Sequence, residues 1–94
     1  MKTSYVYIVT NKYRTTLYVG MTSNLSKRIT QHANGEGSIF TKKYNLTDLI
    51  YYEDFLDINQ AIVREKQLKN WKREWKMDLI KTKNPKLETI KLLG

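Results

Sequence analysis

Two tyrosines on neighbouring strand-like segments are the residues of this chain most suited to chemistry. Tyr7 ends a Tyr-Val-Tyr segment and Tyr18 begins a Tyr-Val-Gly segment, and each follows the period-two pattern of a β-strand. A hairpin centred between Lys12 and Tyr13 would place the two tyrosines directly opposite each other, with Cβ atoms about 4.5–5.5 Å apart. Adjacent phenols can transfer a proton or position a water molecule, although paired tyrosines on a small sheet more often serve packing alone.

One predicted helix directs a guanidinium and an imidazole toward the interior. At about 100° per residue, Arg28 and His32 fall on the same arc as Leu25 and Ile29. The two polar residues are four positions apart, so their side chains can converge. A single histidine on a helix is more often structural than catalytic, and that alternative stays open.

A later helix adds a carboxylate at an apolar position. Glu65 falls between Ala61 and Ile62 on the helical projection. An ionised carboxylate beside an apolar stripe is costly unless it is paired or binds a metal. Glu65 could therefore form a buried salt bridge with Arg28, or the inward-facing polar groups could share a pocket.

The elements that must position these side chains follow from apolar periodicity, turn residues and helix caps. We expect strands at 4–10, 15–21 and 46–55, a turn at 11–14, a helix between Asn24 and Asn34-Gly35, and a polar loop at 35–44. Asp57 is expected to cap a helical region that ends at Asn84-Pro85. This region is either one bent helix or two helices that meet near Asn70-Trp71, and residues 87–93 could add a last helical turn.

The 94 residues are enough for a single domain, 1–94, and their formal charge is +8. Residues 1–63 carry 7 basic and 5 acidic groups, a net of +2, whereas residues 64–94 carry 10 basic and 4 acidic groups, a net of +6. A basic excess in one segment is typical of a protein that binds a polyanion, most often nucleic acid. The alternative is that the charge only keeps a small protein in solution.

Composition excludes several kinds of site. The chain has no cysteine and one histidine, which rules out disulfides, thiolate metal sites and multi-histidine centres. A bound metal would be a hard cation held by oxygen, such as Mg²⁺ or Mn²⁺. No apolar run approaches the ~20 residues that cross a bilayer, and the apolar stretch after Met1-Lys2 is too short for a signal peptide. We therefore expect a cytoplasmic protein.

Together these residues resemble the GIY-YIG nuclease family, and in particular its small stand-alone bacterial members, which are related to the nuclease module of nucleotide-excision repair. The resemblance covers about residues 4–85. The matching segments, in order, are Tyr5-Val6-Tyr7, Tyr18-Val19-Gly20, Lys27-Arg28 with His32, Leu49-Ile50-Tyr51-Tyr52-Glu53, Ala61, Arg64-Glu65-Lys66-Gln67-Leu68-Lys69 and Asn84-Pro85.

The resemblance implies an α+β fold, a small three-stranded antiparallel sheet flanked by helices, with the site on one sheet face. It also implies hydrolysis of a DNA phosphodiester with one divalent metal, Mg²⁺ or Mn²⁺. The resemblance implies that Tyr7 acts as the general base or positions the attacking water, and that Tyr18 positions the water and the phosphate. It implies phosphate binding by Arg28 and metal binding by Glu65. His32 is implied as a further catalytic-site residue, and Asn84 as a late site residue. Lys27, Lys42, Lys43 and Lys69 are the candidates for nucleic-acid binding.

A free tyrosine has a pKa of about 10, so Tyr7 needs cationic neighbours to act as a base. Arg28, a bound metal and His32 are the candidates for lowering that pKa.

Two residues depart from the family pattern: Tyr5 replaces the first glycine, and Met21 follows the second triplet, where repair nucleases can carry a lysine.

Three functions are compatible with the sequence. The first hypothesis is a metal-dependent DNA endonuclease with a structure-specific role in DNA repair or processing. The alternative is a non-catalytic nucleic-acid-binding module on the same scaffold. A third is an interaction protein that docks a partner through a stripe of Trp71, Trp75 and Leu79.

Overall fold

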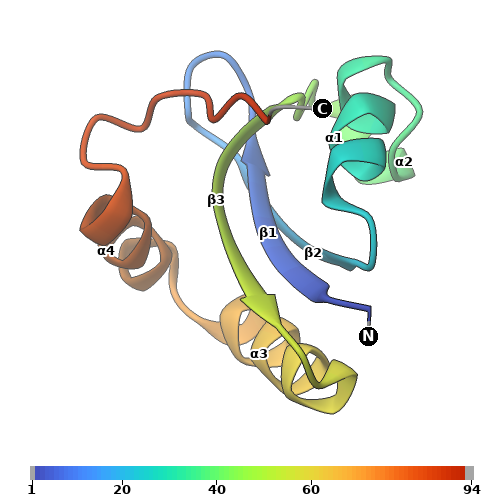
Figure 1. The fold of residues 1–94 in the computed structure, drawn as a ribbon. Helices are drawn as coiled ribbons and strands as arrows, with labels where there is room; N and C mark the ends of the chain where they lie inside the picture. The colour runs from blue at the N-terminus through green and yellow to red at the C-terminus, as the bar shows by residue number, and fades with distance from the viewer. Residues whose placement is uncertain (1, 93–94) are drawn as a thin grey trace.

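A three-stranded antiparallel sheet with helices on both faces forms the centre of the molecule (Figure 1). The computed structural model describes residues 2–92. The elements are β1 (Ser4–Thr10), β2 (Leu17–Thr22), α1 (Leu25–Ala33), α2 (Ile39–Lys43), β3 (Asp48–Phe55), α3 (Ile58–Asn70) and α4 (Arg73–Lys83). The strand order is β2-β1-β3, so the first strand lies in the middle. The predicted α+β class and the three-stranded sheet are confirmed.

The central strand is buried on both faces and divides the core in two. Val6 and Ile8 pack with residues of α3 and α4, whereas Tyr7 and Val9 pack with Leu25 of α1. Because successive side chains of a strand point to opposite faces, the Tyr7 hydroxyl is directed toward α1. Figure 1 shows α1 and α2 together on that side of the sheet.

The hairpin register differs from the prediction by two residues. Tyr7 pairs with Gly20, and Tyr18 pairs with Val9, so the two tyrosines are not direct cross-strand partners. A shift of two keeps every side chain on its face, since the side-chain period of a strand is two. The tyrosines are therefore diagonal neighbours on one face, with Tyr7 opposite a residue that has no side chain.

The connection between β1 and β2 explains this register. The expected turn at 11–14 is a six-residue loop, 11–16, in which the Asn11 side chain accepts hydrogen bonds from the backbone N–H groups of Thr15 (2.8 Å) and Thr16 (3.2 Å). Arg14 adopts the left-handed conformation with φ 58°. The longer loop moves the hairpin centre toward the C-terminus and delays the start of β2 to Leu17.

The caps predicted for the first helix are confirmed. The Asn24 side chain accepts a hydrogen bond from the Lys27 N–H at 3.1 Å, which satisfies a free donor of the first turn. Asn34 is the C-cap residue, and Gly35 follows with φ +75°, the conformation that glycine adopts without steric cost. Because these caps fix the two ends of α1, they also fix the positions of Arg28 and His32 along the helix.

The polar segment 35–44 is not entirely a loop. It contains α2, whose N-cap Ser38 accepts a hydrogen bond from the Thr41 N–H at 3.1 Å. A helix of five residues makes little more than one turn, so it has no apolar period from which to predict it. The third strand also begins later than expected, at Asp48. Before it, Asn45 adopts the left-handed conformation with φ 56°, and the Leu46 N–H donates to the Thr41 carbonyl at 2.9 Å.

The later helical region consists of two helices, one of the two arrangements that the sequence allowed. Trp71 and Lys72 have extended backbone conformations, with ψ 148° and 151°, which separates α3 from α4. Asp57 caps α3 by accepting from the Asn59 N–H at 2.8 Å, and Asn84 ends α4 as predicted. No helix among residues 2–92 is long and apolar enough to span a membrane.

The tryptophan stripe on these helices is mostly internal. Trp71 and Leu79 pack against the core shared by the sheet, α3 and α4, and only Trp75 is largely exposed. The two indole rings make an edge-to-face contact with centroids 6.2 Å apart. One exposed ring is a small surface for docking a partner, so the packing gives the interaction-protein hypothesis little support.

The chain after α4 does not form the expected helical turn. Residues 85–92 are irregular, and residue 93 lies outside the described residues. This segment runs along the free edge of β3, where the Ile90 N–H donates to the Leu49 carbonyl at 2.7 Å. Arg14 of the hairpin loop donates to the Leu87 carbonyl at 3.0 Å. One hydrogen bond to the sheet edge and one from the hairpin loop thus hold a segment that makes no helical turn.

Candidate active site

One cavity of about 320 Å³ is lined by four of the predicted site residues: Tyr7, Tyr18, Arg28 and His32. The tyrosines come from the sheet face that α1 covers, and the guanidinium and the imidazole come from α1 itself. The described residues that complete the lining are Gln31, Glu36, Gly37 and Ser38. The strand alternation and the helical projection thus predicted which side chains meet.

The most buried polar pair of the site is Tyr7 and His32. Tyr7 is fully buried and His32 is 3% exposed, and the Tyr7 hydroxyl lies 3.0 Å from Nε2 of the imidazole. The other ring nitrogen, Nδ1, has no hydrogen-bond partner among the described residues. A proton can therefore move between the phenol and one specific nitrogen.

Burial sets the protonation states of this pair. Burial raises the pKa of the Tyr7 phenol, and the hydrogen bond and positive charge of Arg28 counteract only part of that rise. Burial, followed by the charge of Arg28, lowers the pKa of His32. At neutral pH the phenol is protonated and the imidazole is neutral. A neutral His32 does not supply the positive charge that would favour a phenolate, and its hydrogen bond with Tyr7 is compatible with either tautomer of the imidazole.

Glu65 reaches this region from the other face of the sheet. It lies on α3 and is not among the described residues that line the cavity, yet its negative charge contributes to the raised pKa of Tyr7. Its carboxylate lies 3.7 Å from Lys69 Nζ, which in turn lies 5.9 Å from the centre of the Tyr18 ring. Lys69 thus contacts both the acidic side chain and the ring of Tyr18 on β2, and the ion-pair partner of Glu65 is Lys69 rather than Arg28.

The Glu65 carboxylate fits a hard cation that keeps most of its water ligands. Among the described residues no group of three or more acidic or histidine side chains could enclose a metal. Mg²⁺ does not need such a cage, because it commonly keeps several waters and binds one or two carboxylates plus substrate phosphate. The Glu65–Lys69 pair is four residues apart and partly exposed, so it contributes only about 0.3–0.5 kcal/mol and would not prevent cation binding.

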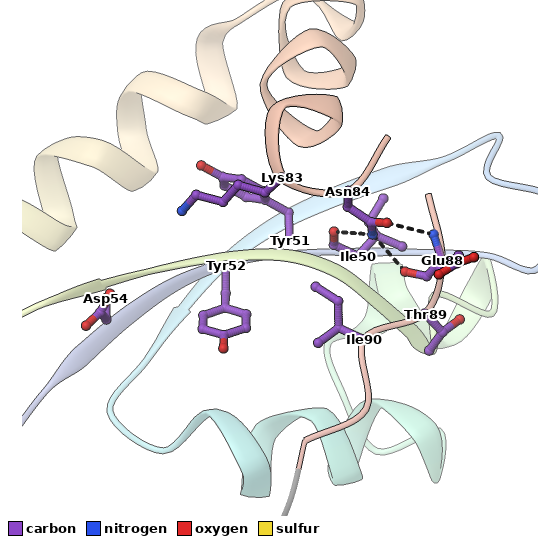
Figure 2. Close-up of a pocket in the computed structure, with 9 residues that line it drawn as sticks. All are labelled: Ile50, Tyr51, Tyr52, Asp54, Lys83, Asn84, Glu88, Thr89 and Ile90. Atoms are coloured by element: carbon purple, nitrogen blue, oxygen red, sulfur yellow. Dashed lines mark hydrogen bonds between the residues drawn. The ribbon is translucent and has the colours of Figure 1, made fainter. Parts of the chain in front are cut away.

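Asn84 does not join the cluster. Its side-chain N–H₂ donates to the carbonyls of Ile50 (3.0 Å) and Glu88 (2.8 Å), and its Oδ1 accepts from the Glu88 N–H (3.0 Å), as Figure 2 shows. It lines a separate cavity of about 380 Å³ beside β3. All its hydrogen bonds go to backbone, so Asn84 joins the end of α4 to the sheet edge.

Two other residues that match the family, Glu53 and Arg64, also lie away from the cavity. Arg64 donates to both carboxylate oxygens of Glu53, at 2.8 and 2.9 Å, and the Tyr51 hydroxyl donates to the same carboxylate. Burial would raise the pKa of Glu53, but the hydrogen bonds from Arg64 and Tyr51 bring it below its usual range. This network ties β3 to α3 and has a structural role.

The four lysines proposed for nucleic-acid binding are all exposed. Lys27 is next to Arg28 on α1, and Lys42 and Lys43 lie on α2. Lys43 Nζ is 5.5 Å from the centre of the Tyr44 ring, and Lys69 contacts Tyr18 as described above. Positive charge thus lies on α1, which lines the cavity, on α2, which follows the lining residue Ser38, and at the end of α3.

Two glycines are required by the site, for reasons that the sequence could not reveal. A β-carbon on Gly20 would lie 2.5 Å from Cζ of Tyr7, and one on Gly37 would lie 2.7 Å from Cε1 of His32 and 2.5 Å from Oγ1 of Thr41. The sequence pattern predicts only that Gly20 ends the second triplet and that residue 37 lies in a polar loop. Their role depends on contacts between distant segments, which no local pattern encodes.

This fold and this cluster of side chains define a domain of the GIY-YIG class. The family model of the GIY-YIG catalytic domain matches residues 3–78, so the chain belongs to the GIY-YIG family. The predicted resemblance is confirmed.

Its relatives include proteins of the UPF0213 group. A UPF0213 protein of Clostridium perfringens is 40% identical over 85 residues, 90% of each chain. One of Staphylococcus saprophyticus is 38% identical over 80 residues, 85% of this chain and 96% of that protein. The solution NMR structure of a UPF0213 protein of Bacillus halodurans aligns with a TM-score of 0.59 and 28% identity over 89% of this chain and 88% of that one.

Proposed function

We propose that this protein is a divalent-metal-dependent endonuclease that hydrolyses phosphodiester bonds of DNA. The observation that carries the proposal is the single cavity in which Tyr7, Tyr18, Arg28 and His32 meet. Membership in the GIY-YIG family supports nucleic acid as the substrate. A structure-specific role in DNA repair or processing is part of the proposal and rests on the resemblance to the excision-repair nuclease module.

Arg28 would bind the phosphate to be cleaved. Its guanidinium is half-buried and lies beside Tyr7 in the cavity wall, where water screens charge less than at the surface. A planar guanidinium can donate two parallel hydrogen bonds to a phosphate. Those bonds would hold the phosphorus next to the Tyr7 hydroxyl and stabilise the negative charge that develops on the phosphate oxygens during attack.

Tyr7 and His32 would move the proton of the attacking water. The water gives a proton to the Tyr7 oxygen while the phenol gives its own proton to Nε2 of His32, 3.0 Å away. The resulting hydroxide forms the new P–O bond, the bond to the leaving oxygen breaks, and that oxygen takes up a proton from solvent water. His32 then returns its extra proton to solvent, which restores the neutral imidazole. For Nε2 to accept, the imidazole proton must be on Nδ1, the buried nitrogen that faces Gly37. Tyr18 would help to position the water.

Glu65 would hold the metal, Mg²⁺ or Mn²⁺, with water and substrate oxygens as the remaining ligands. When bound, the cation supplies Lewis acidity and stabilises charge on the leaving oxygen. The Glu65 carboxylate has one ion-pair partner on its own helix, and Lys69 can turn toward the substrate backbone when that pair opens.

The test is a nicking assay on supercoiled, single-stranded and branched DNA with Mg²⁺ or Mn²⁺. Wild type is compared with Glu65→Gln, and with Glu74→Gln as a control on the first turn of α4. We expect metal-dependent nicking that Glu65→Gln abolishes and Glu74→Gln leaves unchanged. Full activity in Glu65→Gln would contradict the assignment of the metal ligand. Binding that weakens with salt, without cleavage in either metal, would instead identify a non-catalytic nucleic-acid-binding module.

A further inference from the structure

A row of three aromatic rings, Tyr18, Phe40 and Tyr44, extends from the cavity onto α2; we refer to it as the aromatic row. The Tyr18 and Phe40 ring centroids are 6.0 Å apart with planes 27° from parallel, and Phe40 and Tyr44 are 4.8 Å apart at 48°. Phe40 and Tyr44 are 44% and 42% exposed. Two large rings thus keep much of their surface in solvent although they contact each other.

The aromatic row is continuous with the cavity. Tyr18 lines the cavity and also stacks on Phe40, while Gly37 and Ser38, which lead into α2, form part of the cavity wall. A DNA strand with one phosphate bound beside Arg28 would therefore place the neighbouring nucleotide near the aromatic row. Figure 1 shows α2 next to α1, which carries Arg28.

Positive charges flank both ends of the row. Lys69 Nζ lies 5.9 Å from the Tyr18 ring centre, and Lys43 Nζ lies 5.5 Å from the Tyr44 ring centre. Aromatic rings between cationic side chains are typical of surfaces that bind single-stranded nucleic acid, because the rings stack on bases while the cations pair with the phosphates. A neutral apolar partner would gain nothing from the two lysines, so charge favours a polyanionic strand.

We propose that the aromatic row is a stacking platform for an unpaired nucleobase of the DNA strand next to the phosphate in the cavity. The proposal rests on the proposed function for the identity of that phosphate. In a duplex, each base is already stacked between its neighbours, and exposing its face requires unstacking, which costs a few kcal/mol. The structure therefore assigns this protein single-stranded DNA, or DNA with unpaired nucleotides, as its preferred substrate class.

The experiment measures binding without cleavage. A single-stranded oligodeoxynucleotide that carries 2-aminopurine, a fluorescent adenine analogue whose emission changes on stacking, is titrated with the protein in EDTA. The variants are Phe40→Leu and Tyr44→Leu, which keep an apolar side chain but remove the ring. The control is Tyr13→Leu: Tyr13 is 76% exposed, has Lys12 Nζ 5.7 Å from its ring, and is not among the described residues that line the cavity.

We expect 2-aminopurine quenching by wild type and by Tyr13→Leu, tighter binding of the single strand than of the matching duplex, and weaker binding by Phe40→Leu. The expected loss is about 5- to 150-fold in Kd, which corresponds to the ~1–3 kcal/mol of one base–aromatic stack. Unchanged fluorescence, or equal affinity of Phe40→Leu and wild type, would overturn the proposal and leave the row free for a peptide partner.

This readout is independent of the nicking assay. If no metal gives cleavage but ring-dependent quenching persists, the endonuclease proposal fails and the stacking platform stands. If wild type nicks DNA while Phe40→Leu binds and cuts as well as wild type, the stacking platform fails and the endonuclease stands. Circular dichroism and thermal melting of Phe40→Leu and Tyr44→Leu verify that each variant is folded.

Discussion

The Tyr7 phenol lies across Gly20, its direct partner on the neighbouring strand. A β-carbon on Gly20 would lie 2.5 Å from Cζ and 2.9 Å from Cε2 of that ring. Tyr7 is fully buried and packs with Leu25 of α1, so its ring cannot move away from residue 20 without losing these contacts. Tyr7, the last residue of the first triplet, can thus pack in this position only because Gly20, the last residue of the second triplet, has no side chain.

Gly20→Ala should therefore damage both folding and cleavage. Forcing a methyl group into a packed core costs about 1–3 kcal/mol, and the displaced phenol would lose its position beside His32. Urea unfolding measures the first effect and the nicking assay the second. A double-mutant cycle with Tyr7→Ala identifies the cause: when the ring is absent, the alanine at residue 20 should add little further cost. Purely additive losses would show that the clash involves another group.

Tyr7→Phe removes only the hydroxyl that pairs with His32. Loss of a positioned proton-transfer group lowers rates by about 10²- to 10⁴-fold, and the imidazole left without its partner should cost about 1–3 kcal/mol of unfolding free energy. Single-turnover nicking and urea unfolding measure the two effects. Tyr5→Phe is the matched control on the same strand, since Tyr5 packs edge-to-face on Tyr52 with centroids 6.3 Å apart. Equal activity of Tyr7→Phe and Tyr5→Phe would remove Tyr7 from the proton path.

Sequence alone predicted the parts of this fold that depend on neighbouring residues. The Asn24 and Asp57 caps act within three residues, so the starts of α1 and α3 could be placed. The helical repeat put Arg28 and His32 on one face with Leu25, and the structure brings both to the cavity. For Glu65 the same reasoning predicted a position beside the apolar stripe of its helix. It did not predict that the ion-pair partner of Glu65, Lys69, contacts Tyr18, because that contact depends on how α3 packs on the sheet.

The features that sequence did not predict depend on distant contacts. The hairpin register is set by the Asn11 side chain and the left-handed Arg14, which the strand pattern does not contain. The segment after α4 follows the β3 edge instead of forming a helical turn, and the Leu49 carbonyl of that edge accepts a hydrogen bond from the Ile90 N–H. Asn84 was assigned to the site from its order in the family pattern, and order gives no information about which side of the sheet it faces.

Asn84→Ala should weaken the fold without changing the chemistry. Its side chain makes three hydrogen bonds to the backbone of β3 and of residue 88. At a net value of about 0.5–1.5 kcal/mol each, their loss predicts roughly 1–3 kcal/mol less unfolding free energy once partial compensation by water is allowed. The rate of nicking per folded molecule should equal that of wild type. A rate loss larger than the folded fraction explains would return Asn84 to the site; Asn59→Ala, an exposed position on α3, is the control.

Stability should fall as the pH drops below about 6.5, the ordinary pKa of histidine, and activity should fall at more acidic pH, where His32 of the folded protein takes up a proton. The folded protein lowers the pKa of His32, so the unfolded chain binds more protons between the two values, and the free energy of unfolding decreases as the pH falls through that window. A protonated His32 also cannot accept the Tyr7 proton. Asp48 and Glu53, whose pKa values are also lowered in the fold, add to the loss only at more acidic pH.

The measurement is urea unfolding of wild type and His32→Asn between about pH 7 and pH 5, a range that brackets the ordinary histidine pKa. In that range wild type should lose stability with falling pH, while the variant, which has no group to protonate at residue 32, should show a flatter profile. Single-turnover nicking by wild type should begin to fall at a lower pH than stability does, because the folded protein lowers the pKa of His32. Parallel pH profiles of the two proteins would show that another group titrates and that His32 is not the buried neutral base of the site.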